Sequence, residues 1–383
     1  MPDLSPTTFK PVLKKLIKSP LDFGTADIEL ALDHVVTPGA ALPEQVGAFL
    51  TGLAVARVER RKEILIAAAA FLYSRSVPAI VLDSDKDFIV DIVGTGGDSH
   101  NTFNVSTTAA VVAAGAGARV IKVKVYSPPT RLLIVNTARY QHGNRASTSS
   151  SGSADLLQSL GCVFVPPRAE APTPIPGIPF TFLPAWQYHP SLAALAPARR
   201  ALPFRTVFNV LGPLLNPTRP RGMVLGVAEP ALGPPFVAAL KAGGVKRAYV
   251  VCGAEDLDEI SCAGDTHLWE LLDDGSVRER TLCPADFGLP AHPLEEVKGA
   301  SPEENAAAFK TLLTSGDKIP ARLTPVLDFV LMNAAALLVV AGRAADLKEG
   351  ARLAREAVIS GKAWAALEAF RDFAVERESA EAN

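Results

Sequence analysis

The sequence predicts an α/β fold: a small helical domain built from two chain segments, plus a large α/β domain with a mainly parallel central sheet flanked by helices. Three observations lead to this prediction. Residues 1–80 show helical periodicity, the following residues alternate strand and helix patterns, and residues 191–215 return to a helical pattern. The length of 383 residues, at ~150 residues per domain, agrees with two or three domains.

The N-terminal segment is predicted to form four helices. Thr25 is expected to cap the second helix, which ends at Pro38 because proline cannot continue the hydrogen-bond ladder. Two more helices are expected over residues 43–55 and 60–73. The first helix carries an apolar stripe at the i, i+3, i+4, i+7 and i+8 positions, formed by Phe9, Val12, Leu13, Leu16 and Ile17.

Strand and helix patterns then alternate along the chain. Strands joined by helices need crossover connections, which produce a largely parallel sheet. We therefore expect a helical domain of residues 1–80 plus about 188–222, and an α/β domain of about 81–187 and 223–383. The proline-rich residues 166–179 are predicted to be an extended connector. The expected strands cover residues 88–93, 119–123, 162–165, 180–183 and 247–252, and the expected helices cover 105–117, 154–160 and 235–242.

Composition excludes several classes of protein. Lys and Arg number 38 against 40 Asp and Glu, for a net charge of −2, so no basic surplus supports a histone-like role or non-specific nucleic-acid binding. Four cysteines without CxxC spacing argue against a zinc or disulfide framework and favour a reducing, cytoplasmic setting. No signal sequence is expected. The apolar residues 326–341 are interrupted by Asp328 and Asn333 and are shorter than the ~20 residues of a membrane span.

A glycine cluster marks the turn between the strand 88–93 and the helix that follows. Gly94, Gly96 and Gly97 let backbone N–H groups approach an anion, and the helix that starts near Asn104 offers its N-terminus to phosphate. The spacing fits neither standard nucleotide loop, since the third glycine of GxGxxG would fall at Ser99 and no GxxxxGK[ST] occurs. The alternative is a tight turn followed by an ordinary helix cap.

Residues 142–153 form a second polar cluster, HGNRASTSSSGS. One histidine, one arginine and many hydroxyl groups can wrap a polyanion. A serine-rich surface loop is the alternative interpretation.

Residues 255–259 form an acidic run, EDLDE, directly after the expected strand 247–252. Carboxylates at the end of a strand suit Mg²⁺ that also bridges to substrate phosphates. A solvated acidic surface is the alternative. In the second helical segment, Arg199 is a candidate for binding a carboxylate, and His189 is a candidate for a structural or a substrate contact.

Taken together, these motifs resemble one family across nearly the whole chain, the anthranilate phosphoribosyltransferases. DIVGTGGD at 91–98 is shared with nucleoside phosphorylases of the same fold, whereas the combination of HGNRA at 142–146 with RTVFNVLGPLLNP at 205–217 is highly specific. Further matching stretches lie at residues 46–50, 101–107, 257–261 and 304–306.

The resemblance implies transfer of the phosphoribosyl group of phosphoribosyl pyrophosphate (PRPP) to the amino nitrogen of anthranilate, with no covalent catalyst in the protein. It implies a cytoplasmic homodimer that associates through the helical domain. It also implies two Mg²⁺ ions, held by Ser106, Asp258 and Glu259, and an anthranilate site formed by Gly94, Asn144, Arg199 and His189. The residues implied to bind PRPP are Gly94, Gly97, Asp98, Thr102, Asn104, Val105, Ser106, Thr107, Lys122, His142, Gly143, Asn144, Arg145, Ala146, Ser147, Thr148, Ser149 and Ser153.

The chain departs from the family pattern immediately before residue 142. The family has a lysine before HGNR, but this chain has Gln141. Removal of residues 123–141 joins Lys122 to His142 and restores the lysine. This segment opens with Val123, whose codons begin GT, and closes with Tyr140 and Gln141, which TAT-CAG can encode. Its 19 codons (57 nucleotides) suit a short fungal intron. We therefore hypothesise a translated intron, with a lineage-specific loop as the alternative.

Two other functions are consistent with parts of the sequence. A pyrimidine nucleoside phosphorylase shares the glycine loop but lacks the HGNRA and RTxFN motifs. A non-catalytic relative that binds nucleic acid needs a basic face, which the charge balance does not supply.

Overall fold

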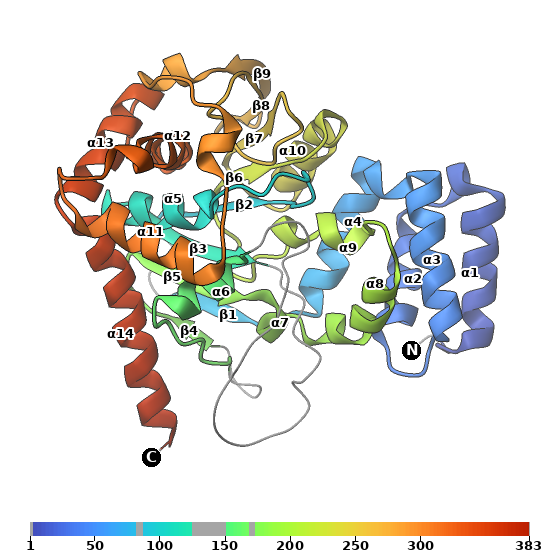
Figure 1. Ribbon diagram of the computed structural model, residues 1–383. Helices are drawn as coiled ribbons and strands as arrows, with labels where there is room; N and C mark the ends of the chain where they lie inside the picture. Colours follow the sequence, from blue (N-terminus) through green and yellow to red (C-terminus); the bar gives the residue numbers. More distant parts are fainter. Residues whose placement is uncertain (1–2, 82–86, 125–150, 168–172, 383) are drawn as a thin grey trace.

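The computed structural model describes residues 3–81, 87–124, 151–167 and 173–382. It confirms the predicted α/β fold, in which a helical layer lies beside a sheet flanked by helices (Figure 1). The helical layer is formed by α1 (Pro6–Lys18), α2 (Thr25–Val36), α3 (Pro43–Ala56) and α4 (Lys62–Ser74).

The beginnings of these helices follow from their side chains. Ser5 caps α1, and its hydroxyl oxygen accepts the N–H of Thr8 at 3.3 Å. The prediction that Thr25 caps α2 is wrong by one residue. Gly24 is the cap, because its N–H donates to the carboxylate of Asp27 at 2.7 Å, and Thr25 is already helical.

The sheet has seven strands in the order β5-β3-β2-β6-β7-β8-β9. Its first five members are parallel: β5 (Phe180–Pro184), β3 (Arg119–Lys124), β2 (Ile89–Gly94), β6 (Gly222–Gly226) and β7 (Arg247–Gly253). The sheet is then extended by two antiparallel strands, β8 (Thr266–Leu271) and β9 (Val277–Leu282). A separate parallel pair joins β1 (Ala79–Val81) to β4 (Thr173–Ile175), which lies in the predicted extended connector.

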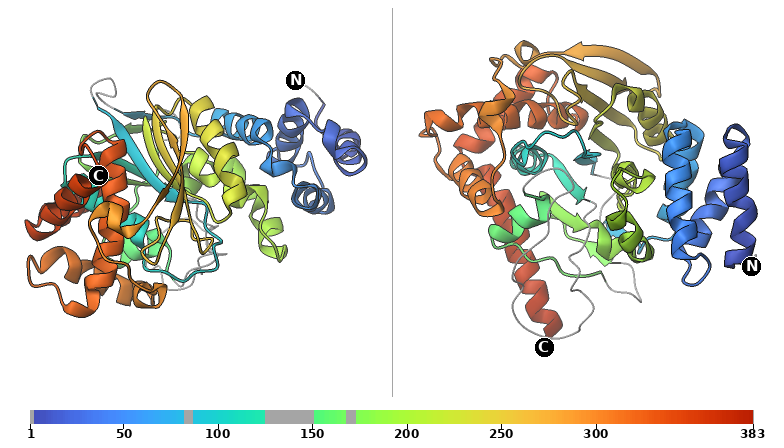
Figure 2. Two further views of the ribbon diagram at one scale, coloured as in Figure 1. Left: turned by 90° about the horizontal axis from the view of Figure 1, so that it is seen from above. Right: turned by 45° about the vertical axis from the view of Figure 1, so that its right-hand side comes forward.

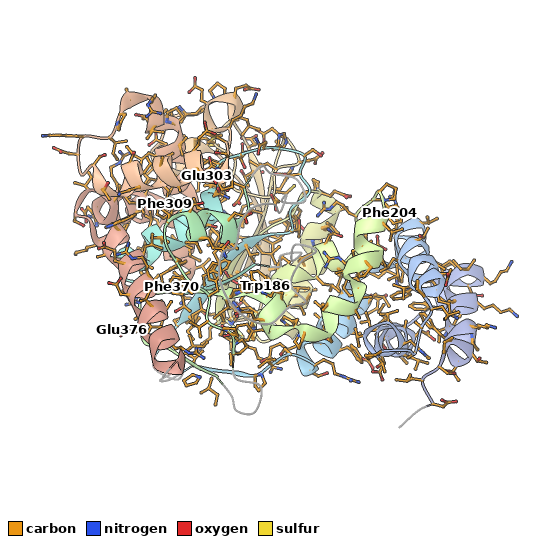
Figure 3. The ribbon with its side chains drawn as sticks, turned by 60° about the horizontal axis from the view of Figure 1, so that its bottom comes forward. Trp186, Phe204, Glu303, Phe309, Phe370 and Glu376 are labelled. Carbon is orange, nitrogen blue, oxygen red and sulfur yellow. The ribbon has the colours of Figure 1, made fainter. Side chains whose placement is uncertain are left out.

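The strand predicted over residues 162–165 is wrong, because this segment pairs with no strand in the described part of the chain. It packs through its side chains instead. The ring of Phe164 lies 5.2 Å from that of Phe182 and 6.5 Å from that of Trp186. Trp186 and Phe370, whose ring contacts Phe180, are labelled in Figure 3.

Both faces of the parallel part of the sheet are buried, and adjacent residues of a strand enter different cores. Val224 of β6 faces the core beneath α5 (Val105–Gly115), whereas Leu225 faces the core shared with the helical layer. The first core is completed by α6 (Ser153–Ser159), α11 (Pro302–Thr314), α12 (Thr324–Val340), α13 (Leu347–Ile359) and α14 (Lys362–Ala382), and α10 (Gly233–Ala242) covers the other face (Figure 2).

Residues 321–340 are the one described stretch long and apolar enough to cross a membrane, and 83% of its most apolar window is buried inside the fold. They are therefore explained as the core helix of the α/β part.

The predicted second helical segment is confirmed as a run of short helices between β5 and β6, with no strand in its described backbone. It packs on α2 and α3. The run consists of α7 (Ala185–Tyr188), η3 (Pro190–Leu195), α8 (Ala196–Ala201), α9 (Val207–Val210) and η4 (Gly212–Leu214). The other 3₁₀ turns are η1 (Pro20–Asp22), η2 (Val58–Arg60), η5 (Pro230–Leu232), η6 (Pro284–Phe287), η7 (Leu294–Val297) and η8 (Ala321–Leu323).

Candidate active site

The acidic turn at residues 255–259 lies directly on the ends of β2 and β6. Gly94 and Gly226 are neighbours in the two strands. A Cβ on Gly94 would lie 2.1 Å from Oδ2 of Asp258, and a Cβ on Gly226 would lie 1.6 Å from the carbonyl oxygen of Asp258. Glycine is therefore required at both strand ends, because only glycine lets the acidic turn approach the sheet this closely.

The glycine loop after β2 is held in shape by Arg205. Its guanidinium donates to the carbonyl oxygens of Thr95 at 3.4 Å and of Gly97 at 3.3 Å, and also to that of Gly96. The N–H of Gly96, which belongs to the same peptide group as the carbonyl of Thr95, donates to Asp258 Oδ2 at 2.5 Å. The sequence indicated the loop but gave no role to Arg205, which is 109 residues away along the chain from Gly96.

The backbone of this loop explains why neither standard glycine pattern is present. Gly96 and Gly97 have φ values of 72° and 81°, and Ser99 has a φ of 63°. Ser99 therefore adopts a left-handed conformation without being a glycine, and a Cβ on Gly97 would overlap Arg205.

The N-terminus of α5 brings two predicted parts of the site together. Asn104 caps the helix, and its Nδ2 donates to the carbonyl oxygen of Ser151 at 2.8 Å. The hydroxyl of Thr107 donates to that of Ser153 at 2.8 Å. The amide of Asn305 in α11 donates to Oδ1 of Asn104 at 2.9 Å, so the cap is fixed from a distant helix.

The other predicted residues near this helix differ in accessibility. Val105 belongs to the core at 1% exposure, and Ser106 is buried at 7%. Thr102 forms an isolated antiparallel bridge with Lys298. Ser106 and Thr102 both carry a hydroxyl oxygen that can bind a metal or a phosphate, whereas Val105 can contribute only its backbone.

Asp98 and Asp258 form a close carboxylate pair. Burial, followed by the negative charge of Asp258, raises the pKa of Asp98 to about 7. Two adjacent carboxylates favour a proton or a cation between them. Among the described residues, no group of three or more His, Cys, Asp or Glu side chains could hold a metal. The Asp98–Asp258 pair suits Mg²⁺, which uses one or two carboxylates and completes its shell with water and phosphate.

Lys122 lies fully buried in β3, and its ammonium donates to the carbonyl oxygen of Ile92 in β2. Nearby, the buried carboxylate of Asp91 accepts from Nδ2 of Asn216 at 2.9 Å, which also donates to the carbonyl oxygen of Ile121 at 2.9 Å. Burial raises the pKa of Asp91 to about 6. Asn216 thus ties the end of the second helical segment to the two strands that lead into the site.

The two residues of the second helical segment that are predicted to bind anthranilate differ in their burial and in their hydrogen bonds. His189 is 1% exposed, and its Nε2 donates to the carbonyl oxygen of Leu215 at 2.7 Å. Burial lowers its pKa, so the ring is neutral. Arg199 on α8 is half-buried, and its Nε has no hydrogen-bond partner among the described residues. Burial lowers the pKa of this guanidinium.

Several predicted site residues lie outside the described part of the chain. They are His142, Gly143, Asn144, Arg145, Ala146, Ser147, Thr148 and Ser149. The hypothesised intron also lies there, except for its first two residues, Val123 and Lys124, which end β3.

Comparison with known proteins identifies the family. The family described as glycosyl transferase family, a/b domain, matches residues 86–127 and 137–364. An anthranilate phosphoribosyltransferase from Schizosaccharomyces pombe is 41% identical over 364 residues, which cover 93% of this chain and 95% of that protein.

Solved structures agree with this assignment. Anthranilate phosphoribosyltransferase from Saccharomyces cerevisiae, in complex with PRPP and Mg, is 32% identical with a TM-score of 0.83, covering 97% of this chain and 99% of that one. The same enzyme in complex with 4-fluoroanthranilate is 30% identical with a TM-score of 0.82, covering 98% and 100%. The chain belongs to the anthranilate phosphoribosyltransferase family of transferases.

Proposed function

We propose that this chain transfers the phosphoribosyl group of PRPP to the amino nitrogen of anthranilate. The products are N-(5-phosphoribosyl)anthranilate and pyrophosphate, and the reaction is the second step of tryptophan biosynthesis from chorismate. The observation that carries the proposal is the contact of the glycine loop with Asp258 at the ends of β2 and β6, in a chain of this family.

Loss of anthranilate fluorescence on mixing the protein with PRPP and Mg²⁺ tests the proposal. The assay is run on the 383-residue chain and on a form lacking residues 123–141. Fluorescence loss that requires both PRPP and Mg²⁺ in at least one form supports the assignment. Two folded forms that both leave anthranilate unchanged would refute it.

The chain's own residues act by binding and orientation. The amine of anthranilate attacks C1 of the ribose, the bond from C1 to the pyrophosphate oxygen breaks, and the amine loses one proton. The loop shaped by Arg205 and the N-terminus of α5 offer backbone N–H groups to phosphate oxygens. Such positioned donors stabilise the departing pyrophosphate without a covalent intermediate.

Two Mg²⁺ ions are proposed to bind together with PRPP, held by Ser106, Asp258 and Glu259. When bound, Mg²⁺ neutralises charge on the leaving pyrophosphate. The adjacent carboxylates of Asp98 and Asp258 support a cation at this place. A related structure contains both PRPP and Mg, which supports the use of the metal in this family.

Replacing Asp258 by asparagine is expected to raise the Mg²⁺ concentration for half-maximal activity by about 100-fold, the upper end of the range for residues that only support a metal ligand. An asparagine oxygen still accepts the N–H of Gly96, so the loop keeps its shape while the metal loses a charged ligand. Initial rates over a Mg²⁺ titration measure the effect, and the melting temperature reports the fold. A Mg²⁺ titration that matches the parent would remove Asp258 from the metal site.

We also propose that residues 1–80, with about 188–222, form one domain that moves against the rest, so that the substrates bind at the hinge. The short helices of the second segment pack on α2 and α3, while Asn216 holds the end of this segment to β2 and β3. This arrangement supports a connection at Asn216 about which the helical layer can turn. The buried free thiols of Cys162, Cys252 and Cys262 support a cytoplasmic location.

A homodimer is proposed to form through the helical layer. Half of the ten exposed large apolar side chains that the structure describes lie within α1–α3 and the adjoining turns. Leu21 and Val55 are 90% and 80% exposed, and Ile17 is 57% exposed. Ile17 lies beside Gly52 of α3, so α1 and α3 present their apolar residues together, as an interface between two copies requires.

The double substitution Leu21→Glu with Val55→Glu is expected to convert the dimer to a monomer, since charges at the centre of an apolar interface lose their hydration. Sedimentation velocity measures the state. Ile359→Glu on α13, where the side chain is 45% exposed, is the control and should leave the dimer intact. A parent chain that sediments as a monomer contradicts the proposal, as does a double variant that remains dimeric.

A further inference from the structure

Two polar residues interrupt the apolar helix α12, and each anchors a segment outside the helix. Asp328 accepts from Nε2 of His292 and from the guanidinium of Arg355, both at 2.9 Å. Asn333 is fully buried. Its amide contacts Ile260, which directly follows the acidic pair Asp258 and Glu259.

The contact between Asn333 and Ile260 uses both sides of the amide. Oδ1 of Asn333 accepts the N–H of Ile260 at 3.2 Å, and Nδ2 donates to the carbonyl oxygen of Ile260 at 3.2 Å. Nδ2 also donates to the carbonyl oxygen of Phe329 at 3.0 Å. A side-chain amide can accept from an N–H group through its oxygen and donate to a C=O group through its nitrogen at the same time.

The buried amide of Asn333 destabilises the folded protein unless it forms these hydrogen bonds. The rest of its neighbourhood is the large core beneath α5, and a buried amide without hydrogen-bond partners destabilises the folded state. The same hydrogen bonds satisfy the N–H and C=O groups of Ile260 inside an apolar core, where an unpaired peptide group is also unfavourable. The two groups therefore satisfy each other.

The acidic turn is fixed at both of its ends. On its N-terminal side, the N–H of Gly253 donates to the carbonyl oxygen of Leu257 at 2.8 Å, and Asp256 adopts a left-handed φ of 60°. On its C-terminal side, the fixed point is Ile260, whose side chain is buried and whose backbone is held by Asn333. Asp258 and Glu259 lie between these two points.

We propose that Asn333 is a positioning residue that holds Asp258 and Glu259 where they bind the Mg²⁺ of the PRPP complex. This inference rests on the proposed function. Asn333 touches neither substrate nor metal and acts through the backbone of Ile260. A purely structural amide would affect stability alone, whereas a positioning amide also sets metal affinity.

The test compares Asn333→Leu with Asp328→Leu, the same substitution at the other polar residue of α12. Both variants should lower the melting temperature. Asn333→Leu should also raise the Mg²⁺ concentration for half-maximal activity and the KM for PRPP by roughly 10- to 100-fold, with the KM for anthranilate unchanged. Calorimetric titration of Mg²⁺ into protein with PRPP should show the same loss of affinity. Asp328→Leu should leave all of these binding values at the parent level.

A folded Asn333→Leu variant with parental Mg²⁺ affinity overturns the inference, and so does an equal loss in Asp328→Leu. If Asn333→Leu does not fold, Asn333→Ala takes its place, because the smaller side chain leaves room for water to pair with Ile260. Asp258→Asn separates the two proposals. Parental Mg²⁺ affinity in Asp258→Asn refutes the proposed metal site itself, whereas weak affinity there with parental affinity in Asn333→Leu refutes only the role of Asn333.

Discussion

Replacing Arg199 by alanine is expected to raise the KM for anthranilate by about 10- to 150-fold, because a hydrogen bond to a charged partner contributes ~1.5–3 kcal/mol. Its Nε is buried without a hydrogen-bond partner among the described residues, and burial lowers the pKa of the guanidinium. A partly desolvated guanidinium of this kind forms a strong charge-assisted hydrogen bond with a carboxylate that binds beside it. The anthranilate carboxylate is the partner that we propose.

Steady-state kinetics with each substrate varied in turn measure the effect. The KM for PRPP should stay at the parent value, which separates a lost anthranilate contact from a general defect. Arg199→Lys keeps the positive charge but loses the planar guanidinium that can form two parallel hydrogen bonds. Its KM for anthranilate should therefore lie between those of the parent and the alanine variant. Arg322→Ala removes an exposed positive charge from η8 and should behave like the parent. An unaltered anthranilate KM in Arg199→Ala would make Arg199 an ordinary structural arginine.

The local parts of this site could be predicted from the sequence because each lies at a strand end. Glycines after the β-branched run 88–93 and carboxylates after the later buried run 247–252 are visible within short windows, and the parallel sheet brings these strand ends to one edge. The same logic explains why Gly94 and Asp258 meet.

The residues that hold those parts in place could not be predicted. Arg205 reaches the glycine loop across 109 residues, Asn305 reaches Asn104 across 201, and Asn333 reaches Ile260 across 73. A pattern within a short stretch of sequence does not indicate contacts between residues so far apart in the chain. Arg205 and Asn305 lie in stretches that match the family, but the match does not say which residues they contact, and Asn333 is marked only as a polar residue inside an apolar run.

The expected strands omitted β6, β8 and β9 of the main sheet, although β6 is wholly buried. β9 has five exposed residues out of six, so it lacks the apolar run from which a strand is usually predicted. Residues 162–165 have that run but no neighbouring strand, and they pack by ring contacts instead. The apolar run therefore indicated packing against the core, where Cys162 is buried and the next three residues are half-buried, but it did not indicate strand pairing.

Deletion of residues 123–141 is expected to raise kcat/KM for PRPP by about 100-fold or more, since misplacing a substrate-positioning group by ~1 Å can cost that much. The family match is interrupted at residues 128–136, inside this segment. In the full chain the ammonium of Lys122 is bound to the backbone of β2, and the HGNR motif begins twenty residues further on. The deletion places Lys122 directly before His142, as the family motif requires.

The fold should tolerate this deletion. Val123 and Lys124 pair with Leu183 and Pro184, and His142 and Gly143 would take their places in the ladder, which uses only backbone groups. A shorter connection also changes closure entropy only slightly, because that cost grows with the logarithm of length. Deletion of residues 125–141 is the matched variant, since it keeps β3 intact and places Lys124 in the sequence directly before His142. Comparing the two identifies which lysine serves the site.

Two measurements decide between an intron and a lineage-specific loop. Sequencing the transcript across codons 122–142 shows whether the 57 nucleotides of this segment are retained in the mature message. Kinetics of the full chain and of both deletions show whether the segment is compatible with PRPP binding. An intron predicts a spliced message and a full chain with a much higher KM for PRPP, because its lysine and its HGNR motif are separated. A message that carries the segment, together with a full chain as active as the better deletion, would establish the loop and refute the intron.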